Sequence, residues 1–170
     1  ARKEKIEMDD LVKAVLRMQY DAPDNFTKKS SDALKEIALH EAGHLVVSEI
    51  LTPGSVGLAS LRTAGRDSTG GFIHRCMPVT RRAHHILISL AGKAAVELYY
   101  SGVCASGCQS DIRKAANNIR DAISESGTGG FGMIDVANHR FPESSESFNS
   151  RNESVVHAEL ERYMFKAREI

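Results

Sequence analysis

The chain has 170 residues, of which 42% are hydrophobic, and this suits one globular domain or one domain with a fragment of another. Its 22 basic and 22 acidic residues give a formal net charge of zero. That balance argues against nucleic acid as a partner, because such proteins carry an excess of positive charge.

The first half of the chain predicts two helices joined by a linker. Apolar residues recur at helical spacing over residues 8–19, behind the acidic pair Asp9 and Asp10. Residues 21–30 contain Pro23 and several turn formers, which is typical of a linker. A long helix is expected to begin near Ser31 or Asp32 and to end before Pro53, since proline cannot continue a helix.

The second half predicts a small β element followed by three more helices. Residues 55–62 and 71–77 resemble short strands around a turn-rich segment. Thr80 is placed to cap a third helix, and a fourth is expected over residues 111–125. Ser150 and Glu153 form a capping-box pattern for the last helix. The predicted fold is therefore mainly α with a small β-hairpin or short sheet.

Three further features limit the kind of protein. The odd number of cysteines argues for a reducing compartment, and we interpret Cys104 and Cys108 as free loop thiols because no second ligand pair accompanies them. No apolar run approaches the roughly 20 residues that cross a bilayer. The chain opens on Ala1 and stops within a helical pattern, so we expect it to be an excised part of something longer.

The motif HEAGH at residues 40–44 lies inside the second predicted helix. Residues four apart on a helix share a face, so His40 and His44 can present two imidazole nitrogens to one metal ion. Glu41 lies about 100° around the helix, where it can act as a base on water without being a ligand. Two neutral histidines favour zinc, and the motif predicts a catalytic zinc site rather than histidines at chance spacing.

The third metal ligand is not adjacent to the motif. Val47 and Ile50 stand where an extended HExxHxxGxxH motif has glycine and histidine. The ligand must come from farther along the chain, and spacing alone does not choose among the candidates, which are His74, His84, His85, Glu97, Asp111, His139 and His157. Gly43 adds a separate indication, since glycine inside a helix costs ~1 kcal/mol and suggests close packing beside the metal.

Five segments in the same order resemble the FtsH family of membrane-linked, ATP-dependent zinc proteases. They are IEMDDLVKAVLRM, IALHEAGHLVV, LAGKAAVEL, SGCQSDIRKAANNIR and the C-terminal RNESVVHAELERYMFKAREI. The resemblance implies a helical zincin-like peptidase domain with one zinc ion per chain, held by His40, His44 and Asp111. The chain also departs from the family at Ala91, Lys93 and Val96, and the family's final helices are missing.

The resemblance also implies an arrangement of domains and partners. Residues 1–20 are similar to the tail helix of an AAA lid subdomain, 21–30 is the linker, and 31–170 is the peptidase domain, truncated at its C-terminus. Gly92-Lys93 is followed by Ala94, so no GxxxxGK[ST] phosphate loop is present and ATP dependence would come from an AAA module upstream in the parent chain. The family forms a hexameric homo-oligomer on the cytoplasmic side, and its parent proteins are membrane-anchored.

The expected activity is endopeptidase cleavage of unfolded or translocated polypeptides, with Glu41 as the catalytic base. The alternatives are a catalytically degenerate zinc-binding adaptor and an unrelated helical domain with a fortuitous motif. Within the site, the resemblance favours Asp111 over Glu97 as the third ligand. Glu97 is the candidate to hydrogen-bond a zinc-bound histidine, whereas Asp111 could alternatively cap its helix unless Ser110 does so.

Overall fold

The computed structural model describes residues 5–20, 30–61, 70–102, 107–126 and 146–170. The elements in these ranges are α1 (Met8–Tyr20), α2 (Ser31–Leu51), β1 (Val56–Ser60), β2 (Phe72–Arg75), α3 (Arg82–Tyr99), α4 (Gln109–Ser126) and α5 (Glu146–Glu169). The expectation of a mainly helical fold with one small β element is confirmed.

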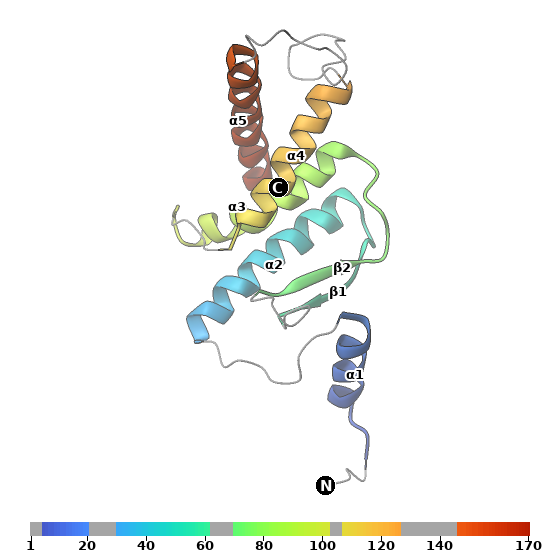
Figure 1. The fold of residues 1–170 in the computed structure, drawn as a ribbon. Helices are drawn as coiled ribbons and strands as arrows, with labels where there is room; N and C mark the ends of the chain where they lie inside the picture. Colours follow the sequence, from blue (N-terminus) through green and yellow to red (C-terminus); the bar gives the residue numbers. More distant parts are fainter. Residues whose placement is uncertain (1–4, 21–29, 62–69, 103–106, 127–145) are drawn as a thin grey trace.

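Helix α2 lies between the two strands on one side and helices α3, α4 and α5 on the other (Figure 1). It packs against α3 on one side and against β1 and β2 on another, while α3 packs in turn against α4 and α5. The core forms where α3, α4 and α5 meet, and its buried side chains include Ile86, Leu90, Ala94, Ala115, Ile119, Ile123, Val156 and Met164. Helices α3, α4 and α5 each contribute apolar side chains to this core.

The strands pair antiparallel, with Leu58 opposite His74 and Ser60 opposite Phe72. The register shifts between Val56 and Leu58, which marks an irregularity at the start of β1. Both strands were expected, and the structure makes each of them shorter than its predicted range. Among the described residues this sheet consists of two strands, and β2 pairs with β1 along one of its two edges.

Helix α1 is set apart from the other helices, beyond the strands (Figure 1). Of the apolar residues that recur at helical spacing along it, Leu16 is buried, whereas Leu11, Val12 and Val15 are exposed. The contact with the rest of the chain includes Tyr20, whose ring centroid lies 4.6 Å from that of Phe72. The helical periodicity was correct, but it does not reveal whether a partner surface lies within the same chain.

The predicted helix starts differ from the observed ones in three places. Thr80 does not cap α3, because the amides of His84 and His85 both donate to the carbonyl of Arg81, which is the N-cap residue. Helix α5 begins at Glu146, so the capping-box pattern lies inside the helix and not at its start. Helix α4 begins at Gln109, which makes Asp111 its third residue rather than its cap.

Candidate metal centre

Two helices bring three side chains with metal-ligand chemistry together. One turn of α2 separates His40 from His44, and their Nε2 atoms lie 3.0 Å apart. The first turn of α4 supplies Asp111, whose Oδ2 lies 3.2 Å from His40 Nε2 and 3.4 Å from His44 Nε2. In the described parts of the chain, these residues form the one group of histidine, cysteine or carboxylate side chains with the proximity needed to hold a metal ion.

The dimensions of this group suit zinc. A tetrahedral zinc ion with bonds of about 2.0–2.1 Å sets its ligand atoms about 3.3 Å apart. The three separations here range from 3.0 to 3.4 Å. Two imidazoles and one carboxylate leave a fourth position open, as catalytic zinc sites require. The residues present therefore fit the metal that the motif predicts.

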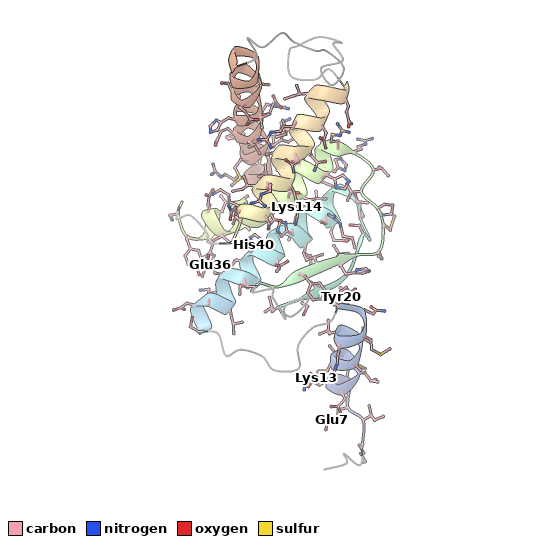
Figure 2. The ribbon with its side chains drawn as sticks, in the orientation of Figure 1. Glu7, Lys13, Tyr20, Glu36, His40 and Lys114 are labelled. Carbon is pink, nitrogen blue, oxygen red and sulfur yellow. The ribbon has the colours of Figure 1, made fainter. Side chains whose placement is uncertain are left out.

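Each of the three donor residues has a further contact on its outer side. His44 Nδ1 lies 2.6 Å from the carbonyl oxygen of Ile88 in α3, so Nδ1 donates and Nε2 keeps its lone pair. His40 Nδ1 lies 3.8 Å from the Sγ of Cys108. The Oδ1 of Asp111 accepts a hydrogen bond of 2.9 Å from Lys114 Nζ. Figure 2 labels His40 on α2 and Lys114 near the start of α4, the end of α4 that approaches α2.

The charges of the group are strongly coupled. Burial opposes ionisation of Asp111, but hydrogen bonds with His40, His44 and Lys114 outweigh it and hold the pKa of Asp111 well below its usual range. Burial likewise disfavours the charged form of His40, yet hydrogen bonds with Asp111 and Cys108 raise the pKa of His40 to about 9. The site therefore favours a positive charge beside the Asp111 carboxylate, and a metal ion competes with protons there.

Glu41 projects into a cleft beside the three donors. The cleft has a volume of about 980 Å³, and its lining includes His40, Glu41, Asp111 and the start of β2 at Phe72 and Ile73. A Cβ added to Gly71 would lie 2.7 Å from Glu41 Cγ, so the side chain reaches toward the strand. Burial raises the pKa of Glu41 against the opposing effect of the two histidines. A raised pKa suits a base that must accept a proton near neutral pH.

Two glycines allow α2 and α3 to approach closely at this point. A Cβ on Gly43 would lie 2.4 Å from the Ala91 carbonyl oxygen, so the inference that a neighbouring helix packs against Gly43 is confirmed. A Cβ on Gly92 would lie 2.6 Å from both His40 Cε1 and His44 Nε2. Sequence reasoning did not assign Gly92 to the site, although it lies in a segment that carries the family resemblance.

Gly43→Ala is expected to lower the free energy of unfolding by about 1–3 kcal/mol, because the added methyl group overlaps backbone atoms of α3 that cannot move aside cheaply. Denaturant unfolding measures the change. Gly70→Ala is the control, since no atom lies within 4 Å of the added Cβ, and a change below about 1 kcal/mol is expected. A Gly43→Ala protein as stable as the parent would show that the helices are not in this close contact.

The other candidate ligands lie elsewhere. His74 is exposed on β2, His157 is exposed on α5, and His85 Nε2 contacts the carbonyl of Val79. His139 and Cys104 lie outside the described residues. Cys108 is a free thiol in the turn just before α4, as interpreted, but it is buried beside His40, which the sequence did not indicate. Ser110 is already helical, so the capping role considered for it is also wrong.

Glu97 was considered as a hydrogen-bond partner of a zinc-binding histidine, but in the structure its partners are other residues. Its Oε1 accepts a hydrogen bond from Lys93, and its Oε2 lies 2.7 Å from Arg168 at the end of α5. Both carboxylate oxygens are therefore paired with cations between α3 and α5. The carbonyl of Ile88, not a carboxylate, orients His44. Periodicity placed Glu97 at the edge of an apolar face, but it could not show which helix lies against that edge.

Comparison with known proteins bears on this geometry. The model of the family described as "Peptidase family M41" matches residues 26–164, a range that contains the cleft and all three donor residues. The chain belongs to peptidase family M41. The resemblance of its sequence to FtsH-type peptidase domains is thereby confirmed.

Curated relatives of this M41 chain include FtsH proteins of bacteria. The "ATP-dependent zinc metalloprotease FtsH" of Mycoplasmopsis synoviae is 26% identical over 162 residues, which cover 84% of this chain and 24% of that protein. The "ATP-dependent zinc metalloprotease FtsH 3" of Symbiobacterium thermophilum is 30% identical over 135 residues, covering 74% of this chain and 21% of that protein. The M41 chain thus spans about a quarter or less of the length of these relatives.

Proposed function

We propose that this M41 domain is a zinc-dependent endopeptidase that hydrolyses peptide bonds of unfolded or translocated polypeptides. The observation that carries the proposal is the convergence of His40, His44 and Asp111 at zinc-ligand separations, with Glu41 beside them in the same cleft. The names of the relatives, which are zinc metalloproteases, support the choice of metal and reaction.

In this proposal each residue has a distinct task. His40, His44 and Asp111 hold the zinc ion, which supplies Lewis-acid activation of water and of the scissile carbonyl. Glu41 takes a proton from the attacking water and later gives it to the leaving amine, so that the water oxygen ends in the new carboxyl group and its proton on the new amine. Gly92 leaves the space that both imidazoles occupy, because a side chain at that position would overlap the two rings.

The cleft also supports a mode of substrate binding. Residues Gly71, Phe72 and Ile73 line it, so backbone at the start of β2 faces the same space as Glu41. An extended polypeptide can add to the edge of β2 through main-chain hydrogen bonds. Because these bonds involve no substrate side chain, this mode fits low sequence specificity.

Chelation tests the proposed function. The isolated chain should slowly cleave unfolded casein without ATP, and a chelator should stop the cleavage until zinc is restored. Added ATP should not accelerate the reaction, and tightly folded substrates should resist it. Casein fragments are followed by electrophoresis, with circular dichroism to check that the chelated chain stays folded. Cleavage that persists after complete removal of the metal would contradict the proposal, and zinc binding without any cleavage would favour the adaptor alternative.

We extend the proposal to the domains and assembly of the parent protein, on the basis of the names of the relatives and the sequence resemblance. ATP dependence would come from an AAA module in the parent chain, with residues 1–20 as the tail helix of its lid, 21–30 as the linker and 31–170 as the peptidase domain. The exposed apolar residues of α1 support this division, since they suit packing against another domain. A hexameric ring on the cytoplasmic side, with a membrane anchor upstream, is part of the same proposal. Within the described residues, every helix is too short or too polar to cross a bilayer.

A further inference from the structure

We propose that Cys108 is a positioning residue for His40: its sulfur accepts a hydrogen bond from His40 Nδ1–H and so keeps Nε2 available as a metal ligand. The inference rests on the proposed zinc site. It concerns a thiol that no part of the proposed hydrolysis uses, and it gives His40 an outer partner like the one that Ile88 provides for His44.

The direction of this hydrogen bond follows from the tautomer that metal binding requires. A neutral imidazole carries one proton, and the nitrogen that binds a metal must be the one without it. Nε2 of His40 faces the other two donors, at 3.0 Å from His44 Nε2 and 3.2 Å from Asp111 Oδ2. Nδ1 therefore carries the proton, and the atom placed to accept it is Cys108 Sγ, at 3.8 Å.

The surroundings of Cys108 hold its sulfur in place. Cys108 is 3% exposed and packs in a small apolar cluster with Val96, Leu39 and Ile112. Leu39 precedes His40 in α2, so the cluster links the thiol directly to the helix that carries the two histidines. Such packing leaves the thiol few alternative orientations and keeps water away from the Nδ1 side of the ring.

Cys108 also connects His40 to Asp111 through the backbone. Its carbonyl oxygen accepts a 3.0 Å hydrogen bond from the amide of Ile112, in the first turn of α4. Gly107 before it has a φ of +98°, a left-handed conformation that favours glycine and directs the chain into this turn. The side chain of Cys108 thus orients His40. Its backbone carbonyl accepts a hydrogen bond in the first turn of α4, the helix that carries Asp111.

The test measures zinc affinity and the tautomer of His40 in parallel. The chain and its Cys108→Ala and Cys108→Ser variants are titrated with zinc against a chromophoric chelator, and the imidazole nitrogens are observed by ¹⁵N NMR. Cys108→Ala should bind zinc about 10- to 100-fold more weakly, as losses of such outer partners do, and should lose the protonated Nδ1 signal of His40. Cys108→Ser, which keeps an acceptor, should recover part of both. Cys76→Ala is the control. Because that thiol is exposed, its removal should leave the zinc affinity and the His40 nitrogen signals unchanged.

Three results would overturn the inference while leaving the zinc site intact. One is unchanged zinc affinity in Cys108→Ala. Another is weaker binding with unchanged His40 nitrogen signals and a matching loss of thermal stability, which would make Cys108 merely structural. The third is a sulfur-to-metal charge-transfer band in the cobalt-loaded chain that disappears in Cys108→Ala, because Cys108 would then be a ligand. Failure of the unaltered chain to bind zinc would instead contradict the proposed function itself.

Discussion

Replacing Glu41 with glutamine is expected to leave about one zinc ion per chain and to reduce proteolysis by at least ~10²-fold, the usual contribution of a general base. Glutamine keeps the size of the side chain but cannot accept the proton. The half-buried position of Glu41 in the cleft, next to the histidines, supports this role. Bound zinc is measured by atomic emission, and the rate by the release of casein fragments.

The matched control for this variant is Glu161→Gln, which makes the same change on the exposed surface of α5 and should preserve both zinc and activity. If Glu41→Gln loses zinc and activity to the same extent, Glu41 is a ligand or a structural residue, and the role assigned to it is wrong. If it keeps full activity, the base is a different group.

Asp111→Asn is expected to lower zinc affinity by at least ~10²-fold, because it removes the charge of one proposed ligand and keeps its shape. The carboxylate lies within 3.4 Å of both histidine nitrogens and is held ionised by hydrogen bonds with them and with Lys114. Competition with a chromophoric chelator measures the affinity. A variant with unchanged affinity would remove Asp111 from the ligand set.

Glu97→Gln is the variant for comparison with Asp111→Asn. Because the structure pairs Glu97 with Lys93 and Arg168 and not with a histidine, we no longer expect this change to weaken zinc binding. Burial opposes the ionisation of Glu97, but hydrogen bonds with Lys93 and Arg168 lower its pKa overall. The variant should keep its zinc affinity and lose about 1–2 kcal/mol of stability, as when a charged hydrogen bond is removed. That contribution is fully present above the ordinary pKa of 4.5 and is lost as the pH falls through the lower pKa of the folded chain. Denaturant unfolding at several pH values measures it, and weaker zinc binding would contradict it.

Short-range patterns were sufficient for the elements and for three of the four proposed site residues. The periodicity of apolar residues located the five helices of the described ranges, and the short segments on either side of a turn-rich stretch located both strands. The positions of His40, Glu41 and His44 follow from one helix alone, because 3.6 residues per turn place residues four apart on one face. The interpretation of Gly43 also succeeded, since a costly residue inside a helix indicates a close neighbour.

Long-range packing decided the rest. Spacing along the chain left seven candidates for the third ligand, and only the packing of α4 on α3, which brings the first turn of α4 to α2, places Asp111 beside the histidines. The same packing assigns Glu97 to cations of α3 and α5 and buries Cys108 against His40.

The HEAGH sequence by itself therefore determined a pair of histidines on one helix face and a base about 100° around the helix from His40, because hydrogen bonds within a helix fix that geometry locally. The identity of their partners depended on how closely α3 and α4 approach α2. That distance is set by the absence of side chains at Gly43 and Gly92 and by the packing of side chains from distant parts of the chain, which no local pattern records.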